Sequence, residues 1–122
     1  WLPLSGNMVE ATERLMEAFN PAWTLGGGVG MYPQWLVDLG TAGFVEIESF
    51  SFDVDVTYRQ EDWRGRIRAS AGVAASLSPQ EVERFDQALQ KLLDEGNEPE
   101  VMAVPHRVFA VVAVSPGSLR GF

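Results

Sequence analysis

Four of the nine basic residues lie within ten positions of one another, in a chain whose formal net charge is −8. They are Arg59, Arg64, Arg66 and Arg68, with Tyr58 and Trp63 among them. Arginine binds carboxylate or phosphate through two parallel hydrogen bonds, so the cluster predicts a site for an anionic substrate. The alternative is a solvated helix face on which the arginines pair with Glu61 and Asp62.

His106 is the single histidine of the chain, and it precedes an apolar segment. A histidine at a strand end can act as a general base. Arg107 adjoins it, and no carboxylate stands at a defined spacing, which favours a structural role instead. One histidine without cysteine cannot form a zinc site unless several carboxylates join it, so no metal site is expected.

The run Gly26-Gly27-Gly28-Val29-Gly30 has the composition of a nucleotide-binding loop. Such a loop follows a strand and opens a helix whose N-terminus faces the ligand. This run instead follows a helical segment that ends at Asn20-Pro21. We therefore expect a surface or substrate-side loop, and no cofactor-binding residues in this chain.

Two helices are expected in the first third of the chain. Asn7 and Glu10 have the spacing of an N-cap and its capping partner, and that helix should end at Asn20. Its glutamates, which could be mistaken for paired catalytic carboxylates, fit a solvated face; they are Glu10, Glu13 and Glu17. Pro33 suits the first turn of a short helix closed by Gly40 or Gly43.

Two further helices are expected between residues 57 and 96. Thr57 and Gln60 resemble a helix entry, with a stop at Gly72. Ser78-Pro79-Gln80-Glu81 combines a capping hydroxyl, a proline in the first turn and an acidic partner, and is the clearest helix start in the sequence. Apolar residues at the spacing of one buried face follow it, and Gly96 should end that helix.

Two long segments predict strands. In residues 44–57 the apolar positions change from odd to even numbers, which predicts a β-bulge near residues 48–50, with Asp53 and Asp55 facing water. Two short strands joined by a bend would also explain the change. Residues 104–114 are apolar on both faces, as in central strands of layered α/β sheets. So few other strands are visible that we expect a piece of a larger α/β protein.

Composition limits the class of partner. A net charge of −8 disfavours nucleic acid and anionic membrane surfaces, since both attract basic proteins. The absence of cysteine fits a reducing cytoplasm. No apolar run is long enough for a membrane span. Small molecules or proteins are the expected partners, and 46% hydrophobic residues suffice for a core.

Three segments resemble the C-terminal part of a class I S-adenosylmethionine-dependent methyltransferase of the small-molecule type. The first runs from Trp35-Leu36-Val37-Asp38-Leu39 through Ala42-Gly43-Phe44-Val45-Glu46-Ile47-Glu48, and is similar to that family's helix, "aGF" turn and sixth strand. The others are residues 63–73 and 104–112. Together the three matches and the segments between them cover most of the chain.

The resemblance implies a seven-stranded Rossmann-like sheet whose last strand is antiparallel and lies between strands five and six. Residues 1–122 would then be a single partial domain, an antiparallel strand pair with about four helices. Residues 58–103 would be a helical insertion between the last two strands. Residues 1–4 would be the exit from strand five.

The resemblance also implies a function, methyl transfer from S-adenosylmethionine to a small-molecule acceptor. The acceptor-binding residues would be Tyr58, Trp63, Arg64, Arg66 and His106. That family binds its cofactor through a glycine-rich loop after its first strand and an acidic residue after its second. Neither strand is in this chain, so we expect it to be inactive alone. A rival from another class is a non-enzymatic α+β module that forms a homodimer through its strands.

Overall fold

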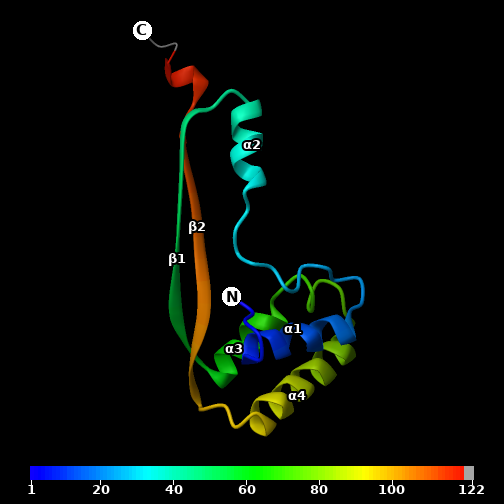
Figure 1. Cartoon of the computed structure of the whole chain (residues 1–122). Coiled ribbons are helices and arrows are strands. Elements are labelled where there is room, and N and C mark those ends of the chain that lie inside the picture. Colours follow the sequence, from blue (N-terminus) through cyan, green and yellow to red (C-terminus); the bar gives the residue numbers. More distant parts are fainter. Residues whose placement is uncertain (120–122) are drawn as a thin grey trace. The chain divides into compact units, whose positions relative to one another are not determined.

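The structure is a computed structural model, and it describes residues 1–119 (Figure 1). It contains four α-helices and one antiparallel pair of strands, which confirms the expected coarse α/β class. The elements follow in the order α1 (Met8–Phe19), α2 (Gln34–Thr41), β1 (Val45–Arg59), α3 (Gln60–Arg68), α4 (Pro79–Glu95), β2 (Val101–Val114) and a 3-10 helix (Pro116–Leu119).

The chain divides into two compact units. The helical unit comprises Trp1–Val29 and Asp55–His106, and it contains α1, α3 and α4. Among the described residues, the hairpin unit comprises Gly30–Val54 and residues 107–119, and it contains α2. Both strands contribute residues to both units.

The starts of α1 and α4 confirm the capping signals of the sequence. The Asn7 side chain accepts a hydrogen bond from the Glu10 amide at 2.9 Å. Ser78 and Glu81 form a reciprocal capping box, and Pro79 is the first residue of α4. Because capping satisfies amides that would otherwise lack a partner, both helices begin where the sequence predicts.

Loss of the capping box of α4 should lower the stability of the protein by a measurable amount. Ser78→Ala is expected to lower the free energy of unfolding by about 1 kcal/mol, because the Glu81 amide loses its acceptor. Chemical denaturation followed by circular dichroism measures the change, with the exposed Ser5→Ala as the control. An unchanged midpoint for Ser78→Ala would contradict a stabilising role of the cap.

The core of the helical unit is formed by one face of each helix and the start of β2. Residues Phe85, Leu89 and Leu93 of α4 recur at helical spacing and are fully buried. They pack with side chains of α1, α3 and β2 and of the α3–α4 connection, namely Val9, Met16, Trp63, Ile67, Val73, Met102 and Val104. This confirms the apolar face that the sequence predicts for α4.

Helix α3 differs from its expected boundaries. Thr57 belongs to β1, and α3 begins at Gln60 without a side-chain cap. The Gln60 amide donates to the Glu100 carbonyl at 2.9 Å, so a contact with the segment before β2 replaces the local cap. The helix ends at Arg68, with Ala69 as its C-cap, and the expected stop at Gly72 was wrong.

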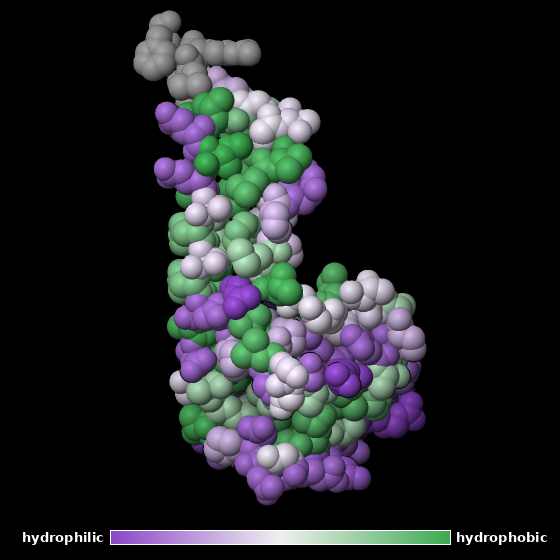
Figure 2. All heavy atoms as spheres, in the orientation of Figure 1, coloured by the Kyte–Doolittle hydropathy of each residue, from purple (hydrophilic) through white to green (hydrophobic). Residues whose placement is uncertain are grey.

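In the hairpin unit, α2 ends in a glycine cap. The Gly43 amide donates to Gly40 and the Phe44 amide to Leu39, and Gly43 has a φ of +91°, which glycine adopts without strain. Tyr32 and Trp35 stack with ring centroids 4.5 Å apart, and both contact Phe109 of β2. Large apolar side chains stay exposed here, and Figure 2 shows hydrophobic residues gathered in this part of the chain.

Strand β1 is continuous from Val45 to Arg59. Its unusual backbone angle lies at Glu46, where φ is +51°, two residues before the expected bulge. Asp53 and Asp55 are exposed, as expected. The even-numbered apolar side chains on the other face are also exposed in the hairpin unit, where Phe50, Phe52 and Val54 are 54%, 51% and 42% exposed.

Residues 1–4 are not a strand, but they lie against β2. The Leu2 amide donates to the Pro105 carbonyl at 2.8 Å, and the Leu2 side chain is buried. That carbonyl belongs to the edge of β2 that does not pair with β1. Among the described residues, no helix has the length and apolar character needed to cross a membrane.

Candidate functional site

Three of the five predicted site residues come together in an aromatic cluster of the helical unit. The Tyr58 ring meets the Trp63 indole edge-on at 5.4 Å and lies parallel to the His106 imidazole at 6.1 Å. Trp1 meets Trp63 edge-on at 5.8 Å. The end of β1, the start of α3 and the middle of β2 therefore converge on one cluster, to which the N-terminal segment adds Trp1.

Trp63 is the fully buried member of this cluster. Its side chain has no exposed surface, and its indole N–H donates to the Thr12 hydroxyl at 3.3 Å. A buried indole finds such a partner because an unpaired N–H in an apolar core is costly. Trp63 therefore joins α3 to α1 in this structure.

The Arg64 side chain is also bound by another group of the protein. Its guanidinium makes two hydrogen bonds to the Asp86 carboxylate of α4, at 3.1 and 2.7 Å, and Arg68 pairs with the same carboxylate. The hydrogen bond from Arg64 is the main reason why the pKa of Asp86 is lowered. The carboxylate in turn raises the pKa of Arg64. The partner is thus Asp86, and not Glu61 or Asp62 as in the alternative reading of the sequence.

Arg66 and His106 lie at the exposed side of the cluster. The Arg66 guanidinium lies 5.0 Å from the centre of the Trp1 ring, a cation–π distance, and the side chain is exposed. His106 is half-buried, with Nδ1 2.9 Å from the Val104 carbonyl oxygen. A carbonyl can only accept, so Nδ1 carries the proton, and Nε2 of the neutral ring is an acceptor.

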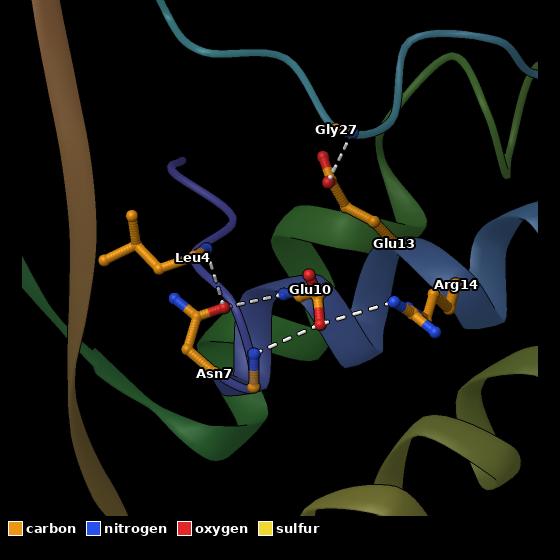
Figure 3. Close-up of polar contacts among 7 residues, drawn as sticks. Leu4, Asn7, Glu10, Glu13, Arg14 and Gly27 are labelled. Atoms are coloured by element: carbon orange, nitrogen blue, oxygen red, sulfur yellow. Dashed lines mark hydrogen bonds and ion pairs between the residues drawn. The ribbon is translucent and has the colours of Figure 1, made fainter.

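The sequence reading missed Glu13. Glu13 is 5% exposed, and its carboxylate accepts from the Trp1 indole N–H at 2.9 Å and from the Gly27 amide at 3.0 Å. Figure 3 shows the contact with Gly27. The expectation of a solvated face was therefore wrong at this position. Glu13 stands four residues after Val9 and three before Met16, on the apolar side of α1, and that spacing could have revealed its burial.

A hollow of about 370 Å³ lies beside Glu13. It is lined by Pro3, Glu10, Glu13, Arg14, Glu17, Gly26 and Gly27. Glu10 accepts from the Gly6 amide at 3.1 Å. Its carboxylate lies 3.5 Å from the Arg14 guanidinium, and Figure 3 shows this ion pair. The Gly27 amide donates to a carboxylate of the protein itself, so the glycine run does not present it to a phosphate. In the described part of the chain, no cluster of metal-ligating side chains occurs.

The accessible groups of the cluster can bind a ligand, but none of them is a strong nucleophile. Tyr58 supplies a ring and a hydroxyl, His106 an acceptor nitrogen, and Arg66 a positive charge. Comparison of the chain with protein-family models, with curated proteins and with solved structures found no match.

Proposed function

We propose that this chain is the acceptor-side, C-terminal portion of a Rossmann-like, class I S-adenosylmethionine-dependent methyltransferase domain. The parent enzyme transfers a methyl group to a small molecule, and its cofactor site lies in a portion outside this chain. The lack of cysteine accords with a cytoplasmic location.

One observation carries the proposal, namely the hydrogen bond between Leu2 and Pro105. It places residues 1–4 on one edge of β2, while β1 pairs with the other edge. The resulting order is the N-terminal segment, then β2, then β1. The methyltransferase arrangement of strands five, seven and six has the same order, with the last strand in the middle.

In this proposal the acceptor contacts Tyr58, Arg66 and His106. Methyl transfer depends mainly on holding the acceptor atom in line with the sulfonium methyl group, so a site built for binding is sufficient. Arg66 favours an acceptor with negative charge, and His106 Nε2 can accept a proton from it. Trp63 and Arg64 support these residues from within the protein.

The first test is cofactor binding by the 122-residue chain. Titration calorimetry with S-adenosylmethionine is expected to show no complex, because the loop and acidic residue that would hold the cofactor are absent from residues 1–122. A complex of micromolar affinity would overturn the assignment to the acceptor side.

The second test extends the chain. The reading frame upstream of Trp1 is expected to encode about a hundred further residues with a strand, glycine-rich loop and helix. That longer protein should bind S-adenosylmethionine in the same titration. An upstream sequence without such a unit, or a longer protein that does not bind the cofactor, would contradict the proposal.

A second candidate function is the non-enzymatic module that dimerises through its strands. The exposed Phe50, Phe52 and Val54 favour it, because isolated strands with apolar side chains tend to find partners. A reading frame that begins near Trp1, together with a lack of methyl transfer, would favour this candidate over the enzyme.

A further inference from the structure

The middle of β1 is exposed over eight consecutive residues, from Glu48 to Asp55. Its apolar side chains form a stripe on one face, in which the Phe50 and Phe52 rings are parallel with centroids 6.4 Å apart. Within residues 1–119 the sheet has two strands, so one edge of β1 lacks a strand partner. Such an edge offers unpaired backbone amides and carbonyls to another chain.

The edge of β2 that faces away from β1 is blocked at one position. At Pro105 the edge of β2 lacks an N–H, and the Leu2 amide already occupies the carbonyl. β1 contains neither proline nor lysine, the residues that most often block edge pairing. The edge of β2 is therefore blocked at Pro105, whereas β1 contains no proline that would block its own edge.

We propose that β1 pairs antiparallel with β1 of a second copy of this chain, about a two-fold axis at Phe52. Phe52 then faces its own counterpart, and Phe50 faces Val54 of the second copy. On the opposite face of the strand, Ser51 meets Asp53, and its hydroxyl can donate a hydrogen bond to that carboxylate. Every apolar residue of the stripe thus pairs with an apolar residue.

Charge selects this register over its neighbours. A two-fold axis at Asp53 would set Asp53 against its counterpart, and like charges directly opposite each other destabilise a sheet. An axis at Ser51 would set Val54 against Glu48 and Val56 against Glu46, whereas the axis at Phe52 leaves one such pair, Val56 with Glu48. With the axis at Phe52, no two acidic residues of β1 face each other, and the Asp53 charge is partly balanced by Arg107, whose Nε lies 2.6 Å from Oδ1.

This pattern of residues fits a second copy of the chain as the binding partner, because a two-fold interface requires a surface that is complementary to itself. The inference depends on the open edge and not on methyl transfer. It holds equally if the chain is part of an enzyme or a separate module.

The first experiment measures mass in solution. Light scattering after size exclusion should give twice the 13.4 kDa of the chain. Phe52→Lys brings two lysines together at the axis and should weaken the dimer at least tenfold, about 1.4 kcal/mol. The control is Val37→Lys on α2, at a residue 59% exposed, which should remain dimeric. A monomeric wild-type chain, or a Phe52→Lys dimer of unchanged strength, would overturn the proposal.

The second experiment does not depend on a disruptive change. The chain has no cysteine, so one introduced thiol reports on one contact. Under mild oxidation, Phe52→Cys should form a disulfide-linked dimer, because counterparts at the axis are close enough to bond. Val101→Cys, at a residue 55% exposed on β2, should remain reduced. Equal linkage of the two variants would exclude an axis at Phe52.

Discussion

Trp63→Ala is expected to destabilise the helical unit by about 3–5 kcal/mol, the usual cost of removing a large aromatic side chain from a core. Trp63 is fully buried and contacts both Trp1 and Tyr58. The substitution also leaves the Thr12 hydroxyl without its indole donor. Because domains of this size are stable by about 5–15 kcal/mol, much of the stability of the unit would be lost.

Urea denaturation followed by circular dichroism measures this loss. The matched control is Trp35→Ala, since Trp35 is 47% exposed on α2 and its removal should cost less than about 2 kcal/mol. Trp63→Phe should be intermediate, because it keeps most of the packing and loses the hydrogen bond. Equal losses for the two tryptophan-to-alanine variants would contradict the central position of Trp63 in the core.

Asp86→Asn is expected to lower the free energy of unfolding by about 2–3 kcal/mol at pH 7. The Asp86 carboxylate accepts hydrogen bonds from Arg64 and Arg68, and its side chain is 18% exposed. A carboxamide would carry no charge, and its NH2 group would replace one of the two acceptor oxygens that the guanidinium groups contact. Asp55→Asn, at an exposed carboxylate of β1, is the control and should change little.

The pH dependence of the free energy of unfolding distinguishes the loss of the Asp86 charge from a change in the shape of the side chain. Arg64 lowers the pKa of Asp86 in the folded protein. The contribution of the ionised carboxylate is therefore complete above its unfolded pKa of about 3.9, and it is lost as the pH falls through the lowered folded value. The difference between wild type and Asp86→Asn should be constant from pH 7 to about 5 and shrink in more acidic solution. A difference that stays constant to pH 2 would contradict this explanation.

The elements set by local chemistry could be predicted from the sequence. Ser78 with Pro79 and Glu81 gives a helix start that depends on neighbouring atoms alone, and the structure confirms it. Asn7 at the start of α1 is a similar case. Both signals involve residues three apart, a distance over which side chains and amides meet without help from the rest of the fold.

The features missed by sequence reading depend on contacts between distant residues. Nothing near Arg64 in the sequence indicates Asp86, which lies one helix further along the chain. The start of α3 depends on Glu100, and not on the cap expected at Thr57. The alternation in β1 predicts two faces correctly but cannot tell whether another element covers the apolar one.

Glu13 has a consequence for local motion. Its two carboxylate oxygens hold the Trp1 indole and the Gly27 amide, which are 26 positions apart in sequence. Displacing either group leaves the buried carboxylate with one donor fewer, which costs free energy, so we expect the two contacts to form and break together. We therefore expect the N-terminal segment and the glycine run to open as one cooperative unit, although no covalent bond or direct contact is needed between them.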